Sequence, residues 1–481
     1  MNKLTSSTLL GLTLALGACS LAPKYERPAS PVAAAWPSGA AYVPDSPNYP
    51  DVADLQWQNF LADDALRKVV RLALDNNRDL RLAALAVERA QGMYGIRRGD
   101  LFPSLGADGG KARQQSSVDL LSPGQPRRAT LYSVEAGFAA WEIDFFGRIR
   151  NLSEQALEEY LATDEGRRGA QIALVAQVAR TYCLLAADRE NLALAQSTLE
   201  SQQAAYDLIK KRFDVGVVSD LDLKRAHIPV DTARGDVARY TQAAAQDLNA
   251  LVLLAGAPVP DEWLPAGLQS VGMLKDVAAG LSSEILLRRP DVMAAEHRLK
   301  GAYASIGAAR AALFPRVTLT GTFGSASGEL SRLFGRGTGT WLFAPQFAAP
   351  IFDTTLWAAL RVSETDREIA LTQYEKAIQS AFREVADALA VRGTIDEQLA
   401  AHVSLTATIA DTYHLARERY ASGVDDYLSV LDAQRSLLSA QQALVMLRFA
   451  KLSAQIQLYA ALGGGAEGGS GSTTESTEKS D

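Results

Sequence analysis

This 481-residue chain is internally duplicated, because it carries similar motifs twice in the same order. Leu101-Phe102-Pro103 recurs as Leu313-Phe314-Pro315. Further on, Lys211-Arg212-Phe213-x-x-Gly216-Val217 lines up with Glu418-Arg419-Tyr420-x-x-Gly423-Val424. The spacing between paired motifs drifts only slightly, so both halves should carry the same elements. Self-similarity of this kind predicts one elongated body built from two related units.

Each half is predicted to contain a helix, two strands, a long helix, a turn and a second long helix. We place the first repeat at residues 61–270 and the second at 271–462. Alternation of polar and apolar residues predicts a β-hairpin in each, at 103–141 and 315–350, and Val317 to Phe323 alternates strictly. Alternating stretches of about ten residues with aromatic ends are typical of transmembrane strands. The alternative is an ordinary hairpin on a water-soluble protein.

The number of predicted strands bears on assembly. Two hairpins supply four strands, whereas about eight is the practical minimum for a closed barrel. An open sheet edge in lipid leaves backbone groups unpaired, at a cost of several kcal/mol each. No stretch after the N-terminus approaches 18 consecutive apolar residues, so we expect no transmembrane helix. We therefore predict an α+β chain that oligomerises, with three copies closing a twelve-strand transmembrane β-barrel.

Long helices account for most of each repeat. Helical periodicity runs over 66–99, and proline-free stretches with a heptad rhythm cover about 151–213 and 356–420. Some sixty helical residues extend on the order of 90 Å, longer than ordinary globular helices. Each long helix should turn at Gly216 or Gly423 and run back. Such hairpins are predicted to form a hollow helical barrel that continues the β-barrel.

The residues after the second turn are candidates for a gate. Leu428, Asp432 and Arg435 follow at spacings of four and three, which places them on one helical face. In a hollow oligomer, a ring of leucines can seal a pore, and a ring of aspartates repels itself and attracts cations. The alternative is that Asp425 and Asp426 only cap the helix and that the leucines only pack in a coiled coil.

The N-terminus resembles a bacterial lipoprotein signal. Lys3 supplies the positive charge, Leu9 to Leu16 form a short apolar region, and Leu16-Gly17-Ala18-Cys19 is similar to a lipobox. We predict a signal peptide over 1–18, covalent lipid on Cys19, and a lipid-anchored extended segment over 19–60. The Gly/Ser/Thr/Glu-rich tail over 463–481 is predicted to be disordered.

The composition excludes several function classes. A net charge of −7 argues against a nucleic-acid surface. Four histidines and five methionines are too scattered for a metal site, and Cys183 has no disulfide partner once Cys19 is acylated. No nucleophile–base signature, phosphate-binding loop or metal-ligand spacing is present, so we expect neither an enzyme nor a cofactor beyond the lipid.

Several longer motifs then identify a family. The lipobox, the repeated Leu-Phe-Pro, Ala302-x-x-Ser305-Ile306-Gly307, Phe382-Arg-Glu384-Val385 and Tyr427 to Leu437 resemble the TolC family of outer-membrane factors. They are most similar to the OprM-type lipoproteins of resistance-nodulation-division pumps. The resemblance runs from Cys19 to about Gly465. It implies a homotrimer in the outer membrane, a long periplasmic α-barrel belted by a mixed equatorial region, and passive conduction in drug efflux.

The resemblance also implies partners and site residues. A periplasmic adaptor protein would dock on the helical tips, and a proton-driven inner-membrane transporter of the resistance-nodulation-division class would supply the work. By position, Leu428 and Asp432 would form constriction rings. The residues expected in tip-locking contacts are Arg419, Tyr420 and Arg435, with Asp222 as an inner-helix partner.

Two positions depart from the family pattern. Pro229 interrupts a helix that should continue, and an interior proline kinks a helix at a cost of roughly 3 kcal/mol. Asp425 stands where the type I exporter ducts carry a basic residue, which should remove one linking pair.

The competing function is a periplasmic coiled-coil scaffold that is tethered by lipid and has no channel.

Overall fold

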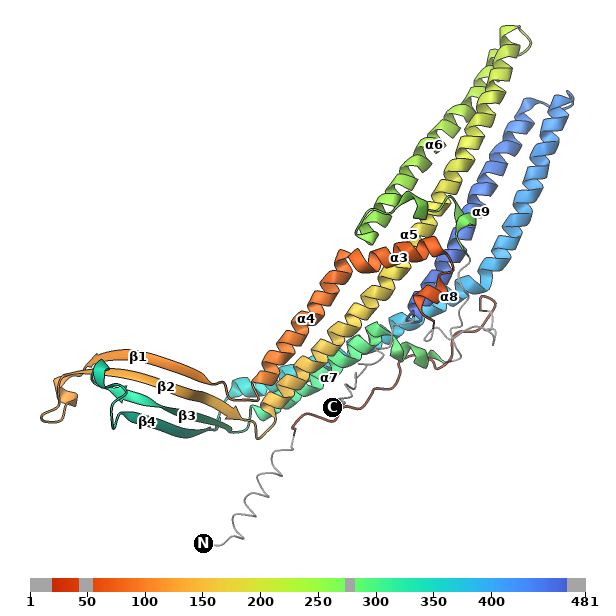
Figure 1. Cartoon of the computed structure of the whole chain (residues 1–481). Coiled ribbons are helices and arrows are strands. Elements are labelled where there is room, and N and C mark those ends of the chain that lie inside the picture. Colours follow the sequence, from red (N-terminus) through yellow and green to blue (C-terminus); the bar gives the residue numbers. More distant parts are fainter. Residues whose placement is uncertain (1–19, 43–54, 273–281, 465–481) are drawn as a thin grey trace, which may run out of the picture. The chain divides into compact units, whose positions relative to one another are not determined.

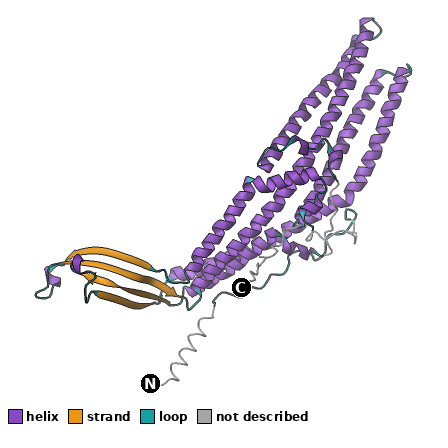
Figure 2. Cartoon of the chain, viewed as in Figure 1, coloured by secondary structure: helices purple, strands orange, loops and turns teal. Residues whose placement is uncertain are grey.

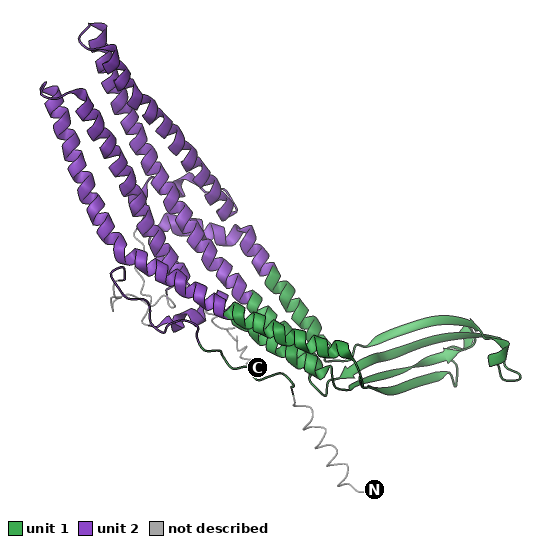
Figure 3. Cartoon of the chain, turned by 180° about the vertical axis from the view of Figure 1, so that it is seen from behind, with its two compact units in different colours: residues 1–29, 86–163, 294–374 green, residues 30–85, 164–293, 375–481 purple. Residues whose placement is uncertain are grey.

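The computed structural model describes residues 20–42, 55–272 and 282–464. Two compact units are formed (Figure 3). Unit 1 takes residues up to 29 together with 86–163 and 294–374, and unit 2 takes 30–85, 164–293 and 375 onwards. Each unit therefore draws on both predicted repeats. The predicted signal peptide, the predicted lipidation site Cys19 and the tail beyond Gly464 lie outside the described residues.

Unit 1 holds the sheet that Figure 2 shows in orange. The described residues form four strands: β1 (Gly106–Gln115), β2 (Arg128–Ile143), β3 (Arg316–Ser327) and β4 (Gly339–Ala348). They build one antiparallel sheet in the order β1-β2-β3-β4 (Figure 1). The strands fall at the predicted hairpins, although β2 continues two residues past the predicted end at 141. The chain thus has an α+β fold.

The two hairpins meet where β2 pairs with β3, and glycine is required at that contact. A Cβ added at Gly137 would lie 2.1 Å from the carbonyl oxygen of Gly321, so the strands approach too closely for a side chain. A bulge shifts the register between Phe138 and Trp141, with Ala140 at a φ of +51°. Bulges bend a strand and increase its twist, so this sheet is locally curved.

The outer strands of the sheet are exposed. Within the described chain, β1 and β4 each pair with a strand on one side only. Every residue of β1 is exposed. Large aromatic side chains also face outward, among them Phe323 at 70% exposure and Trp341 at 81%. Open edges and exposed aromatic surface call for cover by lipid or by another chain.

The helical part of unit 1 comes from α4 (Arg78–Gly99), α5 (Arg148–Asp214), α7 (Pro290–Ala311) and α8 (Thr354–Ala421), each of which continues into unit 2. The chain after the predicted lipidation site is docked against these helices. The Ser20 hydroxyl donates to Asn151 at 2.9 Å, and Arg27 binds the buried carboxylate of Glu296 at 2.8 Å. The first described residues are therefore a fixed part of unit 1.

Unit 2 contains two helical hairpins within the described residues, α5 with α6 (Asp220–Ala255) and α8 with α9 (Tyr427–Ala461). Short helices α2 (Trp57–Phe60) and α3 (Asp64–Asn76) pack beside them, and Phe60 stacks on Tyr459 at 4.1 Å. The helix predicted over 66–99 is two helices, because Asn77 ends α3 and its side chain caps the next turn through the Leu80 amide. That prediction of one continuous helix was wrong.

Helix α5 includes one stretch that is long and apolar enough to cross a membrane by length and composition alone. This finding does not contradict our expectation that the chain has no transmembrane helix, because the buried core helix of a bundle passes the same test. Of this stretch, 56% is buried inside the structure, as in the core helix of a bundle. Buried residues such as Val178, Tyr182 and Leu185 belong to that core.

Candidate functional site

Both predicted turns are present at the ends of the helical hairpins. Helix α5 ends at Asp214 and α8 ends at Ala421. Gly216 has a φ of +77° and Gly423 a φ of +73°, a left-handed conformation that favours glycine. In each turn the amide after the glycine donates to a carbonyl five residues earlier: Val217 to Arg212 and Val424 to Arg419, both at 2.9 Å. This pattern caps both helices in the same way.

An ion pair closes the second turn. The Arg419 guanidinium donates two hydrogen bonds to Asp425, of 2.6 and 2.9 Å. These hydrogen bonds hold the pKa of the Asp425 carboxyl below its usual range. Asp425 thus forms an ion pair within its own hairpin, and the predicted loss of the linking pair made by a basic residue at this position stays a prediction.

A second contact joins the two hairpins. The Arg212 guanidinium donates to the Tyr420 hydroxyl at 2.9 Å and lies 5.7 Å from the centre of the Tyr420 ring. The Tyr420 ring is also 5.2 Å from that of Tyr427. Burial raises the pKa of Tyr427 from its ordinary value to about 12. The predicted site omitted Arg212, although the repeat aligns it with Arg419.

Asp222 has a different local partner from the one expected. It closes a capping box at the start of α6: Ser219 accepts from the Asp222 amide at 3.2 Å, and the Asp222 carboxylate accepts from the Ser219 amide at 3.1 Å. Hydrogen bonds from Ser219 lower the pKa of Asp222. In one chain, this carboxylate therefore serves its own helix end. Its proposed role as an inner-helix partner stays a prediction.

The three gate candidates lie on α9. Leu428 is 46% exposed, and Asp432 accepts a hydrogen bond from Arg435 at 3.1 Å on the same helix. All three line a cavity of about 390 Å³. Helix α6 runs through Pro229 without a break, and Pro229 lines the same cavity. The structure thus brings the candidates together on one helix, where Asp432 and Arg435 pair with each other.

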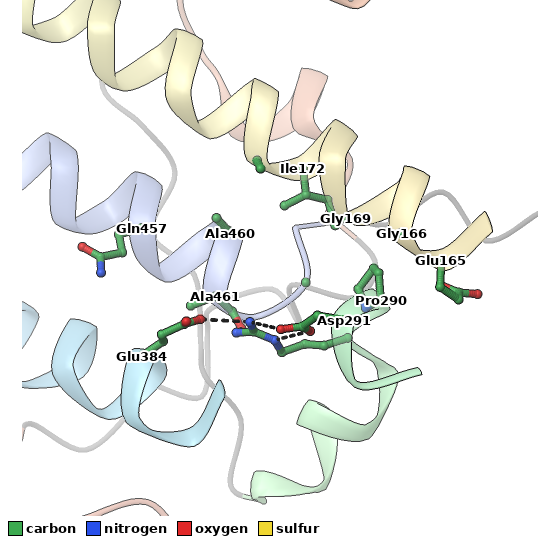
Figure 4. A pocket seen from close by; sticks show the side chains of 13 residues that line it. Glu165, Gly166, Gly169, Ile172, Pro290, Asp291, Glu384, Gln457, Ala460 and Ala461 are labelled. Carbon is green, nitrogen blue, oxygen red and sulfur yellow. Dashed lines mark hydrogen bonds and ion pairs between the residues drawn. The ribbon is translucent and has the colours of Figure 1, made fainter. Parts of the chain in front are cut away.

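A buried arginine joins three other elements of unit 2. Arg289 is 8% exposed, and it donates to Asp291 at 2.7 Å and to Glu384 at 2.9 Å. It also donates to the carbonyl of Ala461, the last residue of α9. Figure 4 shows this cluster beside a cavity of about 440 Å³, with α5 residues Gly166 and Gly169 on the opposite wall. A cation at a helix C-terminus complements the helix dipole, so we interpret Arg289 as a structural clamp.

Among the described residues, no group of three or more histidine, cysteine, aspartate or glutamate side chains is arranged to hold a metal ion. Burial raises the pKa of Cys183 to about 12, which keeps the thiol protonated and unreactive. The contacts that the candidate site does show join helices and helical turns.

The chain matches the family model described as outer membrane efflux protein over residues 69–257 and 281–464. It is 44% identical over 451 residues to the probable efflux pump outer membrane protein TtgC of Pseudomonas putida, which covers 94% of this chain and 93% of that protein. It is also 41% identical to the outer membrane protein OprJ of Pseudomonas aeruginosa, over 96% of this chain and 95% of that protein.

Solved structures give the same result. A membrane protein from Pseudomonas aeruginosa superposes with a TM-score of 0.87 at 40% identity, over 94% of this chain and 99% of that one. The open state of the Neisseria gonorrhoeae MtrE outer membrane channel superposes with a TM-score of 0.84 at 37% identity, over 93% and 99%. The sheet and the helical hairpins are thus shared with known outer-membrane channels.

Proposed function

The chain belongs to the outer membrane efflux protein family, and we propose on this basis that three copies form the exit duct of a tripartite drug efflux pump. It is an outer-membrane efflux channel. The proposal adds the oligomer, the gate, the lipid anchor and the partner proteins. It also takes the protein to be a passive conduit and not an enzyme, because the work of export would come from its transporter.

The proposal of a trimer is supported mainly by the sheet. In the described chain it has four strands, with β1 and β4 open at the edges. Four strands are too few to close around a pore, and open edges in lipid cost several kcal/mol for each unpaired group. Pairing β1 of one copy with β4 of the next removes the edges. Three copies then supply twelve strands, with the exposed aromatic side chains facing lipid.

The helical hairpins support the rest of the duct. Helices α5 and α8, with α6 and α9, would line a periplasmic α-barrel, and the shorter elements of both repeats would form an equatorial belt around it. The turns at Gly216 and Gly423 would form the periplasmic end. There the contacts of Arg419 and Tyr420 would hold the end closed, and Leu428 and Asp432 would constrict it.

The partners follow from the family. The relatives are named as outer membrane proteins of efflux pumps, and we propose a periplasmic adaptor and an inner-membrane resistance-nodulation-division transporter for this chain. Covalent lipid on Cys19 would add outer-membrane lipid as a further contact. The docking of Ser20 on Asn151 supports an anchor held close to unit 1.

Conductance measurements on the purified protein test this proposal. The duct predicts trimers that resist heating in detergent and produce single-channel currents in planar bilayers. The competing function, a lipid-tethered periplasmic scaffold, predicts monomers that leave the membrane once the anchor is cut. A protein with Cys19→Ala, exported by a cleavable signal peptide, separates the two, because a barrel stays in the membrane without lipid. Release of that variant as a soluble monomer would exclude the duct.

A further inference from the structure

A cavity lies in unit 2 where helices α5, α6 and α9 meet. Its volume of about 390 Å³ is within the range of small-molecule sites, roughly 300–1,000 Å³. One part of its wall is apolar and is formed by Ile228, Pro229, Leu428, Leu431 and Leu438. The cavity therefore has the size and the apolar surface to take the hydrocarbon part of a small ligand.

Gln202 places a hydrogen-bond acceptor at this cavity without a partner. The side chain lines the cavity from α5 and is only 5% exposed. Its Oε1 is buried and accepts no hydrogen bond from any described residue. A buried acceptor left unpaired costs free energy, so an N–H group that enters the cavity would be stabilised there.

Pro229 leaves a second acceptor at the same place. Proline has no N–H, so the carbonyl of Arg225, four residues earlier in α6, lacks its usual helical donor. Both residues line the cavity. The proline that departs from the family pattern does not break α6, and it leaves the Arg225 carbonyl without the N–H of residue 229 as a donor.

The charged side chains of the cavity wall balance one another, so hydrogen bonding should determine which ligands the cavity selects. Asp432 accepts from Arg435 at 3.1 Å and Asp236 accepts from Arg239 at 2.9 Å, each through one oxygen. Arg225 also lines the cavity. The lining residues carry two carboxylates and two guanidinium groups, so their charges balance. Hydrogen-bond acceptors that lack a donor therefore distinguish this cavity.

We propose that this cavity binds small amphipathic molecules that carry N–H donors, the class represented by primary alkylammonium ions. The hydrocarbon chain packs on Ile228 and Leu431, and the ammonium group donates to Gln202 Oε1 and the Arg225 carbonyl. This site goes beyond the proposed duct. Binding is measured without conduction, so failure here and failure of the duct are distinguishable.

Calorimetric titration of the full-length protein in amphipol, with empty amphipol as the blank, tests the ligand class. The probes are hexylammonium and hexyltrimethylammonium, which share charge and chain length but differ in N–H donors. We expect saturable binding of hexylammonium and at least about tenfold weaker binding of the trimethyl analogue, as one or two lost hydrogen bonds require. Equal affinities, or no binding of hexylammonium, would overturn the proposal.

Two variants test the acceptors. Gln202→Leu removes the unpaired Oε1 at similar side-chain volume. Its matched control is Gln203→Leu, the neighbouring exposed residue that donates to Asp207 at 3.0 Å. Pro229→Ala supplies the N–H that the Arg225 carbonyl lacks. We expect hexylammonium affinity to fall about five- to tenfold in Gln202→Leu and several-fold in Pro229→Ala, with Gln203→Leu unchanged. If Gln202→Leu misfolds, Pro229→Ala decides alone; unchanged affinity in the folded variants contradicts the site.

Discussion

Arg419 holds Asp425 through two hydrogen bonds of 2.6 and 2.9 Å across the turn at Gly423. The pair ties the last turn of α8 to the residue that precedes the N-cap of α9. It lies at the periplasmic end in the proposed duct. If α9 moves relative to α8 when that end opens, the ion pair between Arg419 and Asp425 must either break or move with the helices.

The pair makes a prediction about pH. Because Arg419 lowers the pKa of Asp425, the stabilisation is present above the pKa of about 3.9 of an unfolded aspartate and is lost as pH falls through the lower folded value. We expect wild-type conductance to stay constant from pH 8 to pH 5. Asp425→Asn should conduct more at neutral pH, while Asp411→Asn on α8 should not. A wild-type rise near pH 6 would contradict the role of this pair.

The bond between the hairpins predicts the effect of Tyr420→Phe. This change removes the hydroxyl that accepts from Arg212 but keeps the ring beside Tyr427. One hydrogen bond contributes about 0.5–1.5 kcal/mol, so the open population should rise roughly two- to tenfold. Single-channel open probability measures this. Tyr413→Phe on the same helix is the control. If Tyr420→Phe has the same open probability as the wild type, Tyr420 has no role in the gate.

The gate candidates on α9 predict changes in both conductance and selectivity. If Asp432 and Arg435 narrow the pore, Asp432→Ala and Arg435→Ala should each raise conductance in planar bilayers. Because an aspartate ring attracts cations, only Asp432→Ala should also lower the preference for cations, as reversal potentials in a salt gradient report. Unchanged conductance in both variants counts against the assignment.

The Arg289 clamp predicts a loss of stability without a change in conductance. Arg289→Met leaves the Ala461 carbonyl and two carboxylates without their donor. Removing one partner of a buried ion pair costs about 3–5 kcal/mol, and the half-exposed carboxylates of Asp291 and Glu384 bring our expectation to about 2–4 kcal/mol. Denaturant unfolding measures this difference. Arg288→Met, at an exposed neighbour, should unfold like the wild type.

Local patterns in the sequence predicted the elements better than their contacts. Strict alternation from Val317 to Phe323 falls within β3, and the proline-free stretches fall within α5 and α8. These elements could be predicted because a repeating polar and apolar pattern is visible in the local sequence, without knowledge of tertiary contacts. The break between α3 and α4 at Asn77 could not be predicted, because asparagine does not interrupt the spacing of apolar residues. The side chain of Asn77 donates to the carbonyl of Leu254, which lies 177 residues away in the sequence.

The contacts of the candidate site differ in whether the sequence alone could predict them. Ser219 and Asp222 stand at capping-box spacing, so their pairing was readable from sequence, and the assigned inner-helix role overlooked it. Arg212 and Tyr420 are separated by 208 residues. Only the packing of two hairpins brings them together, although the alignment of Arg212 with Arg419 in the repeat marked the position.

Cross-linking between the edges of the sheet tests whether three copies of the chain close one barrel. Single cysteines placed along β1 are combined with single cysteines along β4 in a Cys183→Ala background and oxidised in outer membranes. In a closed trimer, matched positions should yield covalent dimers and trimers on denaturing gels and nothing larger. Ladders that continue past the trimer, or the absence of any product between these two edges, would contradict a closed trimeric duct.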